Sequence, residues 1–93
     1  MEFAWDTQKA DEDFKKHGVE FIEAAAVFAD PLSITVADPD HSERENRFIT
    51  VGYSNRFRPL LVSYTDNGDQ VRIISARQLT SAERKDYEEE RNE

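Results

Sequence analysis

Hydrophobic side chains recur at helical spacing in the first third of the chain, after a short stretch in which they alternate with polar ones. The alternation at residues 2–5 predicts a strand. Asp6 suits the N-cap of a helix over residues 7–17, which should end at Gly18 because glycine adopts the left-handed conformation at no steric cost. A second helix is predicted over residues 21–29, and its wide apolar face should lie across a sheet as the main core helix.

From residue 33 onward the hydrophobic pattern changes to a period of two, which is typical of strands. The stretches that predict strands are residues 33–37, 47–53, 60–65 and 70–76. Asn67-Gly68 should join the last two as a tight hairpin, because this pair favours a type I′ turn. Ile73 and Ile74 are adjacent apolar residues, so the last strand should lie inside the sheet with cover on both faces.

A capping box begins the last predicted helix. Thr80 is followed three residues later by Glu83, and this pairing predicts a helix over residues 81–90. Only Ala82 and Tyr87 give that helix an apolar face, so we expect it to dock weakly or on a partner.

The order of these elements predicts an α+β fold in a single domain over residues 1–93. We expect a two-layer sandwich of an antiparallel sheet with two N-terminal helices and one C-terminal helix. The longest apolar run, residues 24–29, is far shorter than the roughly 20 residues of a membrane span, and the chain begins without an export segment, so a cytoplasmic protein is expected. The absence of cysteine excludes disulfides, thiolate metal sites and cysteine nucleophiles.

The charge of the chain is acidic overall but unevenly distributed. The net charge is −8, with ten acidic and three basic residues in positions 1–40. Positions 41–80 instead hold four acidic residues and six basic ones, all arginine: Arg44, Arg47, Arg56, Arg58, Arg72 and Arg77. The guanidinium fork suits phosphate or carboxylate, whereas the acidic remainder disfavours nucleic acid. Solvated charges on exposed strand faces are the alternative explanation of this segment.

Groups that could hold a metal ion are few. His17 and His41 are the two histidines, and neither has a repeated ligand spacing, so no metal or other cofactor is expected. Asp38, Asp40 and His41 could in principle hold a cation, although such a sequence is more often only a polar turn. The sequence has neither a glycine-rich phosphate loop nor a nucleophile elbow.

Two pairs of basic residues stand out by their position. Lys16 and His17 close the first helix, where they either complement the exposed carbonyl groups or form an anion-binding or acid–base site. Arg72 and Arg77 flank an apolar stretch, and a period of two places them on opposite faces unless the strand ends or bulges before Arg77. Because strand ends commonly carry functional side chains, Arg77 is the strongest single candidate.

Several stretches occur in the same order in a known family. The most specific are Lys16-His17-Gly18-Val19 and Arg72-Ile73-Ile74-Ser75-Ala76-Arg77 followed by Thr80, Glu83-Arg84 and Tyr87. The others are Trp5-Asp6, Asp30-Pro31-Leu32, Asp38-Pro39-Asp40-His41 and Arg47-Phe48-Ile49-Thr50-Val51-Gly52. Together they resemble the BrnT family of type II toxins over nearly the whole chain. The resemblance implies a RelE-like ribonuclease fold, RNA cleavage that inhibits translation, and neutralisation by a ribbon-helix-helix, BrnA-like antitoxin.

The resemblance also implies roles for the basic residues. Cleavage by the 2′-hydroxyl of RNA needs no metal ion, and the protein must align the phosphate, transfer protons and stabilise the extra charge. Arg77 would then bind the scissile phosphate, with Arg72 or Arg47 assisting. His17 or Lys16 would transfer protons.

Arg47 and Arg58 are the expected RNA-binding residues, and DNA should be contacted only through the antitoxin. Ribonuclease toxins of this kind are usually basic, whereas this chain has a net charge of −8, and that acidity suits a basic antitoxin better than bare RNA. The alternative is a non-catalytic interaction module that binds a DNA-binding partner and modulates its repression.

Overall fold

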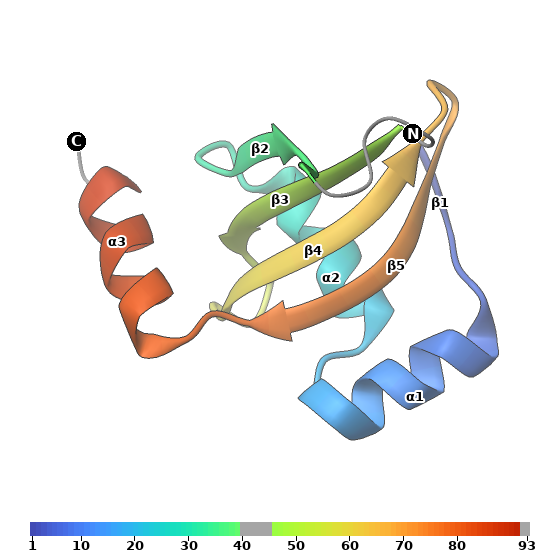
Figure 1. Cartoon of the computed structure of the whole chain (residues 1–93), viewed down its shortest axis with the longest axis horizontal. Coiled ribbons are helices and arrows are strands. Elements are labelled where there is room, and N and C mark those ends of the chain that lie inside the picture. Colours follow the sequence, from blue (N-terminus) through green and yellow to red (C-terminus); the bar gives the residue numbers. More distant parts are fainter. Residues whose placement is uncertain (40–45, 92–93) are drawn as a thin grey trace.

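The computed structural model describes residues 1–39 and 46–91, and five of the described segments form one sheet (Figure 1). The strands are β1 (Glu2–Ala4), β2 (Ile34–Ala37), β3 (Arg47–Tyr53), β4 (Pro59–Asp66) and β5 (Gln70–Gln78). The helical segments are α1 (Thr7–His17), α2 (Phe21–Ala26), the 3-10 turn η1 (Val27–Ala29) and α3 (Ser81–Arg91). In Figure 1, α1 and α2 lie together on one side of the sheet, whereas α3 lies apart from them beyond the end of β5. The predicted α+β class and order of elements are confirmed.

The sheet has the strand order β1-β5-β4-β3-β2 and is mixed rather than antiparallel. Strands β2 to β5 form an antiparallel meander, and β5 lies inside the sheet as predicted. β1 instead runs parallel to β5, with Phe3 opposite Val71, so the prediction of a wholly antiparallel sheet is wrong. The reason is long-range: the chain passes from β1 through α1 and α2 to β2 at the opposite edge of the sheet, and the meander then returns until β5 lies beside β1. The Phe3 ring of β1 packs 5.2 Å from that of Phe28.

The hydrophobic core lies between the sheet and α2. Its buried apolar side chains are Val19, Phe21, Ala24, Val27, Leu60, Val62, Tyr64, Val71, Ile73 and Ala76. The second helix is therefore the main core helix, as predicted, although it ends at Ala26 and continues as η1. Gly52 of β3 lies against this turn, where a Cβ atom would stand 2.9 Å from Cγ1 of Val27, so glycine is what allows the close approach.

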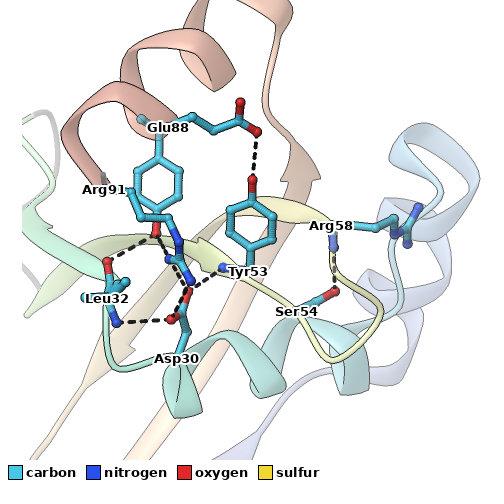
Figure 2. A network of polar contacts seen from close by, with 8 residues as sticks. Asp30, Leu32, Tyr53, Ser54, Arg58, Glu88 and Arg91 are labelled. Atoms are coloured by element: carbon cyan, nitrogen blue, oxygen red, sulfur yellow. Dashed lines mark hydrogen bonds and ion pairs between the residues drawn. The ribbon is translucent and has the colours of Figure 1, made fainter. Parts of the chain in front are cut away.

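α3 is anchored to the rest of the chain by polar contacts (Figure 2). Arg91 donates to both carboxylate oxygens of Asp30, at 2.6 and 3.1 Å, and Asp30 also accepts the backbone N–H of Tyr53 at 2.8 Å. Tyr87 is buried, whereas Ala82, the other residue expected on the apolar face, is exposed. The arginine–carboxylate pair therefore supplies an attachment that the small apolar face of α3 does not. No helix within the described ranges has the length and apolar character needed to cross a membrane.

Candidate functional site

The two arginines of β5 lie on the same face of the sheet because the strand contains a bulge. The register between β4 and β5 shifts after Ser63, where Ile74 has no opposite residue. This extra residue reverses the alternation of side chains along β5. As a result, Arg72 and Arg77 both lie opposite β4 residues that face away from the core, which are Thr65 and Leu61. The face that they share is opposite α1 and α2, and we call it the open face. From the sequence, the two arginines were expected to share a face only if the strand ended or bulged before Arg77, and the structure has this bulge.

Another arginine joins this face where β3 begins. Arg47 and Arg72 are both cross-strand partners of Thr65, one from β3 and the other from β5. Neighbouring strands lie about 4.8 Å apart, so the Cα atoms of the two arginines are about 10 Å apart, with Thr65 between them. The next row on the open face holds the paired residues Ser63 and Ser75. Guanidinium and hydroxyl groups therefore share this surface, and both kinds of group can donate hydrogen bonds to phosphate.

The end of α1 lies against the part of the β5 edge that β1 leaves uncovered. β1 pairs only with residues 70–72, and farther along β5 the carboxylate of Asp13 accepts the backbone N–H of Ala76 at 3.1 Å. Burial raises the pKa of Asp13, while the N–H of Ala76 and the positive charges of His17 and Lys16 oppose that rise. This hydrogen bond connects the last turns of α1 to the residue that precedes the arginine at the end of β5.

Lys16 and His17, the expected proton-transfer residues, occupy the last turn of α1. Lys16 lines a surface hollow of about 290 Å³ together with Ile74 and Ser75, so it adjoins the bulge of β5. His17 is half-buried, and Gly18 ends the helix in the left-handed conformation with φ 71°, as predicted. Both basic residues therefore stand near the last carbonyl groups of the helix, and Lys16 also shares a hollow with Ser75 of the open face.

Arg77 is bound by a carboxylate from α3. Its Nη1 and Nη2 atoms donate to the two oxygens of Glu83 at 2.8 and 3.0 Å. Glu83 also accepts the backbone N–H of Thr80 at 2.8 Å, and its own N–H donates to the Thr80 hydroxyl at 3.2 Å, which confirms the capping box. The Arg77 guanidinium and the Thr80 N–H lower the pKa of Glu83 to about 2. The two side chains are 36% and 38% exposed, so solvent and solutes can reach the pair.

Arg58 lies on the other side of the sheet from Arg77. Its guanidinium donates from Nε to Glu23 at 2.9 Å, makes a second, shorter contact with the same carboxylate, and donates to the Gly18 carbonyl at 3.3 Å. The Ser54 hydroxyl donates to Glu23 at 2.7 Å. These donors lower the pKa of Glu23 although burial opposes them. The structure therefore does not bring Arg58 together with Arg72 and Arg77, and its donors are directed into the protein.

Sequence reasoning missed the carboxylates that hold these cations. Asp13 precedes His17 by four residues, a spacing that places both on one side of α1 and was available in the sequence. Glu83 was expected as a helix cap, but its contact with an arginine six residues earlier depends on how the chain turns into α3. Glu23 lies 35 residues from its arginine, and no local pattern connects the two.

The alternative cation site falls mostly outside the described residues. Asp38 is buried at the end of β2, whereas Asp40 and His41 lie outside the described ranges. Within residues 1–39 and 46–91, no group of three or more histidine, aspartate and glutamate side chains is arranged to hold a metal ion.

Comparisons with known proteins bear on this arrangement. The sequence profile described as the ribonuclease toxin BrnT of type II toxin-antitoxin systems matches residues 5–83. The crystal structure of the Brucella abortus ribonuclease toxin BrnT is similar, with a TM-score of 0.69 and 19% sequence identity, over 87% of this chain and 99% of that one. No match is found among curated protein sequences. The structural similarity shows that the two chains share a fold.

Proposed function

Because the chain belongs to the BrnT family of ribonuclease toxins of type II toxin-antitoxin systems, we propose that it is an endoribonuclease that cleaves RNA without a metal ion and so inhibits translation. The observation that carries this proposal is the placement of Arg47, Arg72 and Arg77 on the open face, with Lys16 at the adjoining edge. Cations spread along a surface can follow the backbone of a single nucleic-acid strand. A surface that serves only for protein docking does not require such an array.

Attack by the 2′-hydroxyl of RNA determines what the protein has to supply. The 2′ oxygen bonds to the adjacent phosphorus and loses its proton, the bond to the 5′ oxygen breaks, and that oxygen gains a proton, which leaves a 2′,3′-cyclic phosphate. Negative charge accumulates on the phosphoryl oxygens, and preorganised cationic donors stabilise such charge by several kcal/mol. We assign Arg77 to the scissile phosphate and Arg72 or Arg47 to a neighbouring one, because the guanidinium fork matches phosphate.

Proton transfer falls to the end of α1. His17 or Lys16 would take the 2′ proton or supply the one that the 5′ oxygen needs, and histidine is the side chain whose charge changes most readily near neutral pH. The hydrogen bond from Ala76 to Asp13 supports this assignment, because it holds the last turns of α1 at the edge of β5, one residue before Arg77 in the chain. Asp13 would act as a positioning residue for that turn.

Glu83 places a condition on this mechanism. RNA has to replace it on Arg77, and a phosphate presents two oxygens to the guanidinium in much the same way as a carboxylate does. Both partners are more than a third exposed, so breaking the pair should cost less than about 1 kcal/mol. Glu83 would therefore occupy the phosphate site until the substrate arrives.

We also propose a ribbon-helix-helix antitoxin that binds α3 and covers the open face. An apolar hollow of about 280 Å³ lies between the sheet and α3. Its floor includes Ile34, Val36 and Ile49, and its rim includes Asp86 and Glu90 of α3. A segment with apolar and basic side chains complements this combination, and DNA would be bound through the same antitoxin. Because the attraction is electrostatic, the association rate should fall markedly between roughly 50 and 500 mM salt, and a salt-independent rate would contradict this interface.

The second candidate is a non-catalytic module that binds a DNA-binding partner and modulates its repression. The net charge of −8 favours it, because an acidic protein finds RNA slowly. The occupation of Arg77 by Glu83 also favours it. This candidate predicts that expression of the chain alone leaves growth unchanged.

Induction of the chain alone, followed by an RNA cleavage assay, separates these proposals. The wild-type protein should arrest growth, and in EDTA it should cut single-stranded RNA to products that carry a 2′,3′-cyclic or 3′ phosphate. Arg77→Ala should lose both activities while its circular dichroism spectrum stays unchanged, and Arg84→Ala on exposed α3 is the matched control. Unchanged growth and intact RNA would favour the module. Cleavage that disappears in EDTA and returns with magnesium would contradict the metal-independent mechanism.

A further inference from the structure

The loop between β3 and β4 holds an exposed aromatic side chain in a strained backbone conformation. Phe57 is 83% exposed and has a φ of 58°, the only positive value among the described non-glycine residues. The left-handed region is rarely occupied by bulky residues, and such strain is typical of sites where a ligand is held. Neither burial in the core nor an ordinary turn preference accounts for a phenylalanine at this position.

A buried polar network holds the loop in this shape. The Ser54 N–H donates to the Arg58 carbonyl at 2.9 Å, and the Phe57 N–H donates to the Ser54 carbonyl at 3.0 Å. The Ser54 hydroxyl accepts the Arg56 N–H at 3.1 Å and donates to buried Glu23 at 2.7 Å. Figure 2 shows the contact between the Arg58 backbone N–H and the Ser54 hydroxyl, at 3.4 Å. The aromatic ring is therefore presented to solvent from a support that is anchored in the protein.

A hollow of about 380 Å³ lies beside the Phe57 ring. Tyr53, Asn55 and Arg91 line it together with Phe57. The Arg91 guanidinium lies 4.5 Å from the centroid of the Tyr53 ring, and Figure 2 shows the two side chains close together. The hollow is thus bordered by two aromatic rings, and Ala26, Ala29 and the Asp30 carboxylate that binds Arg91 also line it. Aromatic rings are groups on which nucleobases stack.

This hollow lies at the same end of the sheet as Arg77. Leu61 of β4 is the cross-strand partner of Arg77, and Phe57 precedes Leu61 by four residues. Four residues span at most about 14 Å, and a neighbouring strand adds about 5 Å. A single strand of RNA bound at Arg77 can therefore reach the β3–β4 loop within several nucleotides.

We propose that Phe57 stacks on an unpaired nucleobase of the RNA substrate, that the hollow beside it receives this base, and that Arg56 contacts an adjoining phosphate. This inference rests on the proposed ribonuclease function and adds a recognition site to it. Arg56 is 69% exposed and lies 3.6 Å from Glu23 at the outer side of the Arg58 pair, so it can turn toward a ligand. An RNA is favoured over a protein partner because exposed Asn55 and Arg56 precede the ring in the same loop and can donate hydrogen bonds to a nucleotide.

Fluorescence anisotropy with a single-stranded RNA whose 2′-hydroxyls are methylated tests the proposal, because this probe binds without being cut. Phe57→Leu keeps an apolar side chain but removes the aromatic face, and it should weaken binding by about 5- to 150-fold. Phe57→Trp should bind as well as the wild type or better. Phe14→Leu changes an exposed phenylalanine on α1 and should leave binding unchanged.

The outcomes separate this proposal from the ribonuclease proposal. Binding that is unchanged in Phe57→Leu overturns the stacking site, while the loss of cleavage in Arg77→Ala would still support the nuclease. A wild type that binds the probe through Phe57 but cuts no RNA supports the stacking site and overturns catalysis. Weakened binding of the antitoxin by Phe57→Leu, with unchanged RNA binding, would place Phe57 in a protein interface instead.

Discussion

Two arginine–glutamate pairs lie at the same end of the sheet, on opposite sides of it, and they differ in burial. Arg58 and Glu23 pair on the side that faces α1 and α2, where their side chains are 24% and 5% exposed. Arg77 and Glu83 pair on the open face, where the corresponding values are 36% and 38%. Glu23 also has the Ser54 hydroxyl as a donor, so its carboxylate is enclosed by partners.

The difference shows how one chemical pair can serve two purposes in the same protein. A buried carboxylate that loses its partner keeps an uncompensated charge away from water, so the Arg58 pair has to remain closed. An exposed pair exchanges its partners with water and solutes at little cost, so Arg77 remains available to a phosphate. The sheet thus separates Arg58, which supports the β3–β4 loop, from the arginines of the open face.

The largest effect is expected on stability when the buried pair is broken. Arg58→Ala should lower the free energy of unfolding by about 3–5 kcal/mol, because buried Glu23 would keep only the 3.6 Å contact with exposed Arg56 as a cationic partner. Urea unfolding followed by circular dichroism measures this, with exposed Arg72→Ala as the control. A stability equal to that of the wild type would show that the pair does not support the fold.

The next largest effect is expected on catalysis when the exposed pair is broken. Arg77→Ala should slow single-turnover RNA cleavage by about 10²- to 10³-fold, because one preorganised donor to the developing charge is lost. Its free energy of unfolding should change by less than about 1 kcal/mol. Arg77→Lys should recover only part of the rate, since lysine lacks the fork. Cleavage by Arg77→Ala at the wild-type rate would remove this residue from the mechanism.

A third effect concerns acid stability and the attachment of α3. The Arg91 guanidinium lowers the pKa of Asp30 from its ordinary 3.8 to about 2. A lowered pKa means that the folded state favours the carboxylate, so this contribution of about 2 kcal/mol is present above about pH 4 and lost as the pH falls to about 2. Thermal unfolding between pH 7 and 2 should show this loss. Asp30→Asn should be less stable than the wild type at pH 7 and should lose less stability on acidification. An equal loss of stability in the two proteins would show that Asp30 does not account for this pH dependence.

A smaller effect, of opposite sign, is expected in the β3–β4 loop. Phe57→Gly should raise the free energy of unfolding by about 1 kcal/mol, because glycine adopts a positive φ without strain. The same variant should bind RNA more weakly if Phe57 stacks on a base. Denaturant midpoints and anisotropy on one protein sample measure both effects. A variant that is less stable than the wild type would show that the loop conformation is not strained.

The smallest effect is expected from releasing Arg77. Glu83→Gln keeps a side chain that can accept the Thr80 N–H but removes the charge that competes with phosphate. Its affinity for RNA should rise by about two- to fivefold, in line with the strength of an exposed ion pair. Glu88→Gln removes a comparable charge from α3 that pairs with Arg84 rather than Arg77, and it should change affinity less. Weaker RNA binding by Glu83→Gln would show that Glu83 does not compete with the substrate.

Local chemistry was sufficient to predict most of the elements. α1 and β3 have the predicted bounds, and the Asp6 side chain accepts the N–H of Gln8 at 2.9 Å as an N-cap should. The capping box of α3 is formed as expected. These features depend on residues within one turn or one strand, so their signals are contained in the sequence. The ordered motifs also predicted the BrnT family, which the profile match over residues 5–83 confirms.

The sequence identified candidate site residues, but it could not show which residues surround each of them in the fold. Arg72 and Arg77 were candidates with undecided faces, and the bulge at Ile74 decided that they share one. Arg58 was expected to bind RNA together with Arg47, and only the folded chain brings it to Glu23. The roles of these residues in cleavage remain predictions that the variants above test.

By itself, then, the sequence determined the element order, the capping residues, the arginine-rich middle segment and the family. Tertiary structure alone decided that β1 runs parallel to β5, that Ile74 bulges, and which carboxylate each arginine meets. The physical reason is the separation along the chain of the residues that determine each feature. Caps and alternation arise from neighbours along the chain, whereas strand partners and buried ion pairs depend on how distant segments share one core, and local patterns carry no record of that packing.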